Sequence, residues 1–324
     1  MDKIIGIDIS KQTFDVCFKE KQELSQKVYG NSLTGFKRFI GLLDPDSHVV
    51  MEASGPYYVP LATYLHGHGY KVSVVNPLKI RRYAQMRFYR AKTDKKDAQA
   101  IMEYATMNPQ ELPVYQPESK TTQSLKQMHT ALELLQKQRH QSKRQLEAFR
   151  ATGYVDTHVS SSLISMVKTL ENRIRKIEEQ MSALCKANCS DSYQALTSIP
   201  SIGDKTAIML IAITDSFKKF THYKQLIAYV GLSPRVYQSG TSIKGKGHIC
   251  KMGKSQIRKL LYMCSWTAKK YNKSCREMYQ RLKAKGKPER VIKIAIANKL
   301  LKQAFAIGKS KENYNENYPI KVCF

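Results

Sequence analysis

The chain has 324 residues, of which 42% are apolar, enough for two or three domains with hydrophobic cores. Lys and Arg number 54 against 26 Asp and Glu, which gives a formal net charge of +28 at pH 7 and an isoelectric point of about 9.8. This excess favours nucleic acid as the partner, with an anionic lipid surface or a merely basic soluble protein as the alternatives. No apolar run approaches the roughly 18 residues of a membrane span, and the opening MDKIIGIDIS runs into a strand pattern rather than a signal peptide.

The first third of the chain alternates strand and helix patterns. Two short alternating or β-branched segments separated by two polar residues indicate a hairpin, and further strands and helices follow at short intervals. The predicted order is strand 3–10, strand 13–20, strand 26–31, helix 32–43, strand 47–54, helix 57–69, strand 70–77 and then a basic helical stretch that reaches residue 106. Three strands, helix, strand, helix, strand, helices is the order of a ribonuclease-H-like α/β fold, so we expect such a domain over residues 1–112.

The middle of the chain changes to helical periodicity. Leucine, isoleucine and methionine recur at spacings of three and four through residues 118–190, interrupted once by ATGYVDTH. This pattern predicts a long antiparallel hairpin or coiled coil over residues 113–190, and an exposed spacer and a dimerisation element remain equal alternatives. Residues 191–310 predict a compact, mainly helical domain, and residues 311–324 a loosely held tail.

The seven cysteines are scattered and form no C-x-x-C pair. Cys185 and Cys189 lie one helical turn apart without a neighbouring histidine. We therefore expect reduced thiols in a cytosol and no zinc site.

Four carboxylates fall at positions where the predicted fold would gather them. Asp8 interrupts the isoleucines of the first strand, where a buried charge is costly unless it is paired, and Glu52 ends the fourth strand. Asp94 and Asp97 lie three residues apart at the start of a helix and so project from one face. If the first and fourth strands are neighbours and this helix crosses their ends, the four would hold Mg²⁺ or Mn²⁺, which prefer oxygen ligands. Taken singly, each aspartate of the pair would more often be a helix N-cap and Glu52 a turn residue.

The basic run KIRRYAQMRFYRAK precedes the aspartate pair. We expect its cations to contact the phosphate backbone, and its aromatic residues either to stack on bases or to belong to the core. The predicted phosphate-binding cations are Arg81, Arg82, Arg87, Arg90 and Lys92, and the aromatic residues are Tyr83, Phe88 and Tyr89.

Two stretches of the last third also suggest phosphate binding. The sequence SIPSIGDKTAIMLIA resembles a helix-hairpin-helix, in which a turn of Pro and Gly points backbone N–H groups at a phosphate from a helix N-terminus. Pro200, Gly203, Lys205 and Thr206 fit this pattern, and an ordinary helix corner is the alternative. The glycine-rich basic stretch 237–259 contains Ser239 and Ser242, each a candidate nucleophile or simply a turn serine. Its predicted phosphate-binding cations are Lys244, Lys246, Lys251, Lys254 and Arg258.

Together these motifs resemble the transposases of the insertion-sequence 110 family, which includes the Piv/MooV-type DNA invertases. The resemblance rests on GIDIS, MEASGPYYVPLATYLHGHGYKVSVVNP, AKTDKKDAQ, IPSIGDKTA, AYVGLSPRVYQSGTSIKG and ICKMGKSQIRKLLY, in this order over nearly the whole chain.

The resemblance implies a RuvC-like domain with a DEDD tetrad on Asp8, Glu52, Asp94 and Asp97, followed by a coiled coil and a transposase domain. Its nucleophilic serine falls on Ser239, with Ser242 as the fallback. It also implies Mg²⁺, a covalent serine–phosphate intermediate, a structured bridge RNA that pairs with donor and target DNA, and a dimer or tetramer whose subunits share active sites. Such a protein would act in the bacterial cytoplasm.

Three other functions are weighed against this one. A metal-dependent nuclease such as a junction resolvase would use the tetrad alone and form no covalent adduct. An actin- or hexokinase-like ATPase would need a second copy of the strand unit, which the helical half does not predict. A non-catalytic nucleic-acid-binding protein would leave DNA unaltered.

Overall fold

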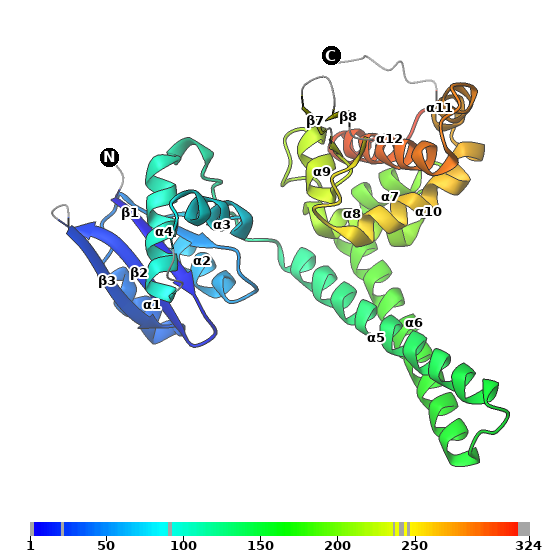
Figure 1. Cartoon of the computed structure of the whole chain (residues 1–324), viewed down its shortest axis with the longest axis horizontal. Helices are drawn as coiled ribbons and strands as arrows, with labels where there is room; N and C mark the ends of the chain where they lie inside the picture. The colour runs from blue at the N-terminus through cyan, green and yellow to red at the C-terminus, as the bar shows by residue number, and fades with distance from the viewer. Residues whose placement is uncertain are drawn as a thin grey trace. The chain divides into compact units, whose positions relative to one another are not determined.

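The structure, a computed structural model, describes residues 3–20, 23–89, 93–235, 237–239, 243–244 and 247–316. The chain divides into two compact units, Met1–Pro117 and Glu118–Phe324, which are described separately (Figure 1). Among these residues, no helix combines the length and the apolar character that a bilayer span requires.

The first unit is built on a five-stranded sheet of order β3-β2-β1-β4-β5. The central strand β1 pairs antiparallel with β2 and parallel with β4, as the sequence predicts for a first strand that lies beside the fourth. The strands are β1 (Lys3–Ile9), β2 (Thr13–Glu20), β3 (Glu23–Gly30), β4 (Ser47–Glu52) and β5 (Lys71–Val75). The helices are α1 (Leu33–Ile40), α2 (Tyr58–Gly67), α3 (Pro77–Met86) and α4 (Asp94–Met107), followed by the 3₁₀ turn Pro109–Glu111.

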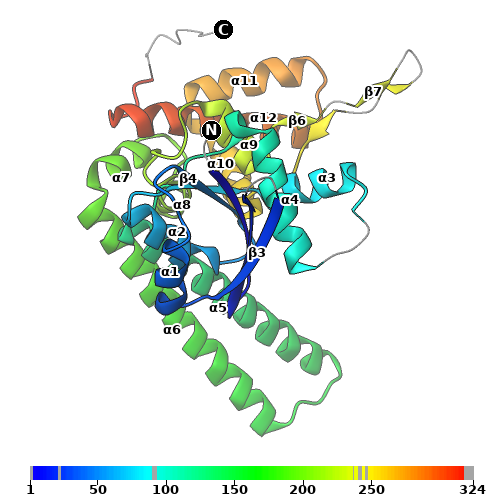
Figure 2. The same cartoon turned by 90° about the vertical axis from the view of Figure 1, so that its left-hand side faces the viewer.

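Helices cover both faces of this sheet, and Figure 2 shows α1 and α2 on one side and α4 on the other. The side chains of Ile5, Ile7 and Ile9 form one core with the inner faces of α1 and α2. The alternate residues of β1 face α4, because successive side chains of a strand point to opposite faces. At Gly6, an added Cβ would lie 2.4 Å from the carbonyl oxygen of Ala98, so only glycine lets α4 approach this closely.

The predicted basic helical stretch consists of two helices. Pro77 begins α3 as its first residue, where its missing N–H is no loss, and the Asn76 side chain caps the helix by accepting from Leu78 N at 2.9 Å. The Thr93 side chain caps α4 by accepting from the N–H of Lys96 at 3.3 Å. Asp94 and Asp97 are therefore not N-caps but acidic residues in the first turn of α4.

The second unit begins with the predicted helical hairpin, α5 (Lys120–Ala151) and α6 (Thr157–Asn188) (Figure 1). Leu125, Leu132, Ile174 and Met181 pack between the two helices and join the core of the helical body. The body consists of α7 (Ser190–Thr197), α8 (Asp204–Thr214), α9 (Tyr223–Val230), α10 (Ser255–Tyr271), α11 (Lys273–Ala284) and α12 (Glu289–Ser310).

At the centre of this body lies α8, whose residues Thr206–Thr214 are all buried, as expected for a helix that is apolar on every side. Between α9 and α10 the chain forms four strands of two residues each: β6 (Pro234–Arg235), β7 (Gln238–Ser239), β8 (Ile243–Lys244) and β9 (His248–Ile249). β6 pairs with β9 and β7 pairs with β8.

Candidate active site

Asp8 and Glu52 lie side by side at one edge of the sheet. The parallel register of β1 and β4 pairs Ile7 with Met51, so Asp8 and Glu52 are the next residues along the two strands. Neighbouring strands lie about 4.8 Å apart, and residues in register point to the same face. Both carboxylates therefore leave the sheet together at its carboxyl edge.

The face on which they project is the face that α4 covers. Asp8 follows Gly6 by two residues, and Gly6 contacts the backbone of α4 at Ala98 and Met102. Glu52 follows Val50 by two residues, and Val50 packs in the core that α3 and α4 form. The alternation of a strand then places both side chains under α4.

The first turn of α4 brings Asp94 and Asp97 to the same place. Gly6 lies against Ala98 and Met102, and Asp8 lies two residues further along β1, which runs towards the amino end of α4. That end carries Asp94 and Asp97, where the positive pole of the helix dipole favours negative charge.

The pKa of Asp8 reflects these neighbouring charges. The pKa of Asp8 is raised from 3.8 to about 6, first by burial and then by the charges of Asp97, Asp94 and Glu52. The structure therefore brings together the four carboxylates that the sequence singled out.

A fifth carboxylate belongs to the cluster and was missed in the sequence. Asp15 of β2 is the direct antiparallel partner of Asp8, so the two side chains share a face. Burial and the charge of Asp94 raise the pKa of Asp15, while Lys95 opposes them. The sequence did contain a signal for it. A two-residue turn between residues 10 and 13 sets the hairpin register that pairs Asp8 with Asp15. Asp15 was missed because it has the pattern of any polar position in an alternating strand.

The donor types of this cluster suit a hard divalent cation, since all five groups are carboxylates. Their positions are not those of a closed site: within the described ranges, no three His, Cys, Asp or Glu side chains are placed to hold one ion. Four carboxylates nevertheless lie near enough to Asp8 to raise its pKa.

The basic run before α4 divides between surface and core. Arg81, Arg82 and Arg87 are exposed, whereas Arg90 and Lys92 lie outside the described residues. The predicted stacking residues differ. Tyr83 is a core residue with 5% exposure.

The other two aromatic residues of this run, Tyr89 and Phe88, differ from each other in exposure. Tyr89 donates its hydroxyl to Glu103 and is half-buried, whereas Phe88 is 86% exposed with a φ of 56°. Of the three, only Phe88 is free to stack on a base.

In the second unit, Ser239 lies in β7, and its backbone pairs with Ile243 of β8. Ser242 and Lys246 lie outside the described residues, as do the side chains of Ser239 and Lys244.

The other predicted cations of this unit hold different positions. Lys251 and Lys254 are exposed next to the start of α10, and Lys205 forms an ion pair with Glu178 at 2.7 Å. Arg258 donates to the carbonyl oxygen of Val230 at 2.7 Å, so part of its guanidinium serves the end of α9.

The turn between α7 and α8 is the one in which the sequence predicts phosphate contacts. Gly203 is the N-cap of α8 and supplies no side-chain acceptor. Its carbonyl oxygen accepts from the N–H groups of Thr206 and Ala207 at 3.0 Å, so that of the first turn only the N–H groups of Asp204 and Lys205 precede the helical hydrogen bonds. Ser201 adopts a φ of 83°, which an L residue rarely does.

Comparison of the amino-acid sequence with known proteins shows which class of proteins the chain resembles. Residues 5–150 match a transposase family named for the DEDD residues and IS110, and residues 193–280 match the transposase family IS116/IS110/IS902. The chain is 32% identical over 324 residues to the pilin gene-inverting protein of Moraxella lacunata, which covers 96% of this chain and 97% of that protein.

Further relatives agree. The transposase for insertion sequence element IS1111A of Coxiella burnetii is 27% identical over 294 residues, 80% of this chain and 76% of that protein. The class is that of enzymes acting on DNA, the transposases and DNA-inverting recombinases. The chain belongs to the IS110 family of transposases.

Proposed function

We propose that this protein cleaves and rejoins DNA strands as the recombinase of an insertion sequence, with a RuvC-like domain in its first unit. The observation that carries the proposal is that Glu52, Asp94 and Asp97 lie near enough to Asp8, at the amino end of α4, to raise its pKa. A cluster of this charge is costly unless cations are shared, and phosphoryl transfer is the chemistry in which shared divalent cations are used. The match to relatives named as transposases and as a pilin gene-inverting protein supports DNA as the substrate.

In this proposal Asp8 and Glu52, on rigid strands, and Asp94 and Asp97, on the first turn of α4, are the ligands of Mg²⁺ or Mn²⁺. When bound, such ions would polarise the scissile phosphate and stabilise the charge on the leaving oxygen. Asp15, opposite Asp8, adds negative charge beside the ligands. The exposed Arg81, Arg82 and Arg87 hold the flanking phosphates.

The nucleophile in this proposal is the hydroxyl of Ser239. Its oxygen forms a bond to phosphorus, the bond from phosphorus to the 3′ oxygen breaks, and the serine proton ends on that oxygen as a 3′-hydroxyl. The phosphoserine bond conserves the energy of the broken DNA linkage, so that rejoining the strands requires no nucleoside triphosphate. Within a dimer or tetramer, the serine and the carboxylates of one active site come from the same or different subunits.

The choice of DNA site is proposed to belong to a structured guide RNA. The family resemblance supports this part, and so does the net charge of +28, which exceeds what a single duplex contact needs. Base pairing would then carry the sequence specificity, while the protein binds backbone and shape.

The test is a denaturing gel of the protein with labelled substrate DNA, guide RNA and Mg²⁺. The native protein and Ser242→Ala should both form a protein–DNA adduct, and Ser239→Ala should form none. Loss of the adduct with Ser242→Ala instead would move the nucleophile to Ser242. Cleaved DNA without any adduct would replace the proposal by a metal-dependent nuclease of the junction-resolvase type.

A further inference from the structure

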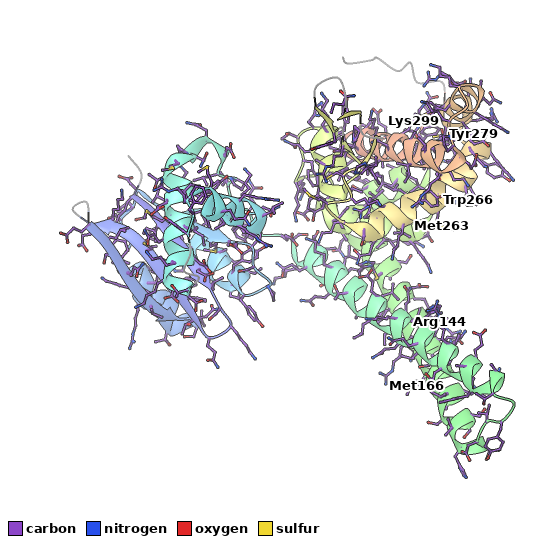
Figure 3. All side chains as sticks on the ribbon, viewed as in Figure 1. Arg144, Met166, Met263, Trp266, Tyr279 and Lys299 are labelled. Carbon is purple, nitrogen blue, oxygen red and sulfur yellow. The ribbon has the colours of Figure 1, made fainter. Side chains whose placement is uncertain are left out.

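The only tryptophan of the chain, Trp266, lies on the surface of the second unit and not in its core. It is 48% exposed on α10, and Met263, one turn before it, is 64% exposed (Figure 3). The opposite side of the same helix is buried, with Leu261, Cys264 and Ala268 in the core. A large apolar pair on the outer side of a well-packed helix marks a contact surface.

Lysines bracket this pair. Lys259, Met263, Trp266 and Lys270 follow one another at spacings of four, three and four residues, and all four are exposed. These spacings place them in one stripe along the helix, with the Cβ atom of each lysine about 6 Å from the Cβ atom of its apolar neighbour. We call these four residues the α10 stripe.

Two lysines lie against the indole of Trp266. Lys293 of α12 lies with its ammonium 3.3 Å from the ring centroid, and its side chain is only 6% exposed. Glu289, on the same helix, pairs with Lys293 at 3.4 Å and with Lys269 at 2.9 Å. The ammonium of Lys269 also lies 5.9 Å from this centroid. These cation–π contacts orient the ring, while 48% of the residue stays exposed to solvent.

The surroundings of the stripe are positive. Tyr279 of α11 donates its hydroxyl to Glu289 at 2.9 Å, and Lys269 and Lys283 lie 4.8 and 5.8 Å from its ring centroid. Glu289 pairs with two lysines, Lys269 and Lys293, and with Lys283 over the Tyr279 ring the cluster has three lysines for one carboxylate.

Charge decides which partner fits this surface. Protein interfaces also use tryptophan and methionine, but their cores are poor in lysine, and a second copy would bring a like charge against the stripe. A polynucleotide offers both complements, flat bases for the indole and phosphates for the lysines. Aromatic platforms flanked by cations are how proteins hold single strands. Duplex bases are already stacked on one another, so the ring requires an unpaired base.

We propose that the exposed part of the Trp266 indole, with Met263 beside it, stacks an unpaired base of a single-stranded polynucleotide whose neighbouring phosphates contact Lys259 and Lys270. This site is separate from the carboxylate cluster and deepens the proposed function by adding a contact for unpaired nucleic acid. It depends on nucleic-acid binding alone and on no step of strand cleavage.

The test uses the fluorescence of the protein itself, since Trp266 is the sole tryptophan. The full chain is titrated in EDTA, at an ionic strength of about 0.15 M, with a single-stranded oligoribonucleotide, the matching oligodeoxyribonucleotide and the blunt duplex, each about 12 nucleotides long. We expect saturable quenching by at least one of the single strands and little by the duplex. The stronger of the two single strands identifies the polynucleotide as RNA or DNA.

Variants separate stacking from charge and folding. Because stacking of one base contributes about 1–3 kcal/mol, Trp266→Ala should weaken single-strand binding by about 5- to 150-fold, and Trp266→Phe should restore most of it. Both variants lack the sole tryptophan, so their binding is measured by the fluorescence anisotropy of a dye-labelled single strand. Tyr271→Ala is the matched control, an aromatic residue on the same helix that is 69% exposed but lies off the stripe. Circular dichroism and thermal unfolding check that each variant is folded.

Three results would overturn the proposal: equal quenching by duplex and single strand, equal binding by Trp266→Ala and Tyr271→Ala, or self-association that Trp266→Ala abolishes while oligonucleotides leave the fluorescence unchanged. Because EDTA excludes metal-dependent cleavage, a chain without recombinase activity would still give the expected quenching. Failure here, in turn, would leave the adduct test of Ser239 unaffected.

Discussion

In the first unit every carboxylate of the cluster stands on a regular element, whereas in the second unit the turns expected to meet phosphate depend on irregular backbone. Asp8, Asp15 and Glu52 are placed by strand register, and Asp94 and Asp97 by one helical turn. Of the seven non-glycine residues with positive φ in the described part, six lie in the second unit. Ser239 lies in a strand of two residues. The acidic cluster is thus held by rigid elements, whereas the phosphate contacts predicted for the second unit would depend on turns, whose backbone N–H groups can point outwards together.

The sharpest test of the rigid site is Asp8→Asn, which removes one charge and keeps the shape. We expect metal-dependent strand cleavage to fall by at least ~100-fold, since loss of a direct ligand should cost no less than loss of an outer partner. In EDTA the variant should be more stable by about 1–2 kcal/mol, because burial and four carboxylates oppose the charge of Asp8 and solvent screens part of that penalty.

The control for Asp8→Asn is Asp46→Asn, an exposed aspartate at the opposite end of β4. It should change neither cleavage nor stability measurably in the same gel and thermal unfolding assays. If Asp8→Asn destabilised the protein as an ordinary core substitution does, the electrostatic account of the cluster would be wrong.

Gly6→Ala tests whether close packing of α4 builds the site. The new Cβ would meet Ala98 O at 2.4 Å and Met102 N at 2.5 Å, and both are backbone atoms that cannot turn aside. We expect a loss of about 3 kcal/mol in unfolding free energy by denaturant titration, with loss of cleavage as α4 moves away. Gly67→Ala, near the end of α2, is the control, since nothing lies within 4 Å of its added Cβ. Equal stability of the two variants would contradict this account.

Asp15→Asn tests the carboxylate that sequence reasoning missed. Because Asp15 is the direct partner of Asp8 and adds negative charge beside the proposed ligands, its loss should weaken divalent-ion binding and cleavage by about 10-fold, the scale of an outer partner. The measurement is cleavage rate against Mg²⁺ concentration, where the midpoint should move to higher concentration. A midpoint identical to that of Asp46→Asn would make Asp15 a bystander.

The difference between the two units also decides what the sequence could predict. The tetrad followed from element order alone, since neighbouring parallel strands with carboxylates at their ends leave little freedom, and the structure places Asp8, Glu52, Asp94 and Asp97 on one face. Asp15 needed the hairpin register, which composition does not give.

Other positions depended on tertiary packing. Tyr83 and Phe88 occur in the same aromatic and basic pattern, yet one is buried and the other exposed. The pattern alone could not separate them. The roles of Ser239 and of the lysines around it remain predictions, because no periodic pattern orients a side chain in such a loop.

The smallest expected effect concerns the turn before α8, where irregular backbone is present without a glycine. Ser201 has a φ of 83°, and its hydroxyl oxygen is buried without a hydrogen-bond partner. Ser201→Gly removes both penalties, and we expect a gain of about 1 kcal/mol in unfolding free energy. Ser201→Ala removes only the hydroxyl and keeps the strained Cβ, so its gain should be smaller.

If the turn contributes to phosphate binding through its backbone, duplex affinity measured by fluorescence anisotropy with a labelled DNA should be unchanged in Ser201→Gly, because the N–H groups of α8 keep their positions. A large loss of affinity would instead assign the contact to the serine side chain and would make the strain at Ser201 a cost retained for binding.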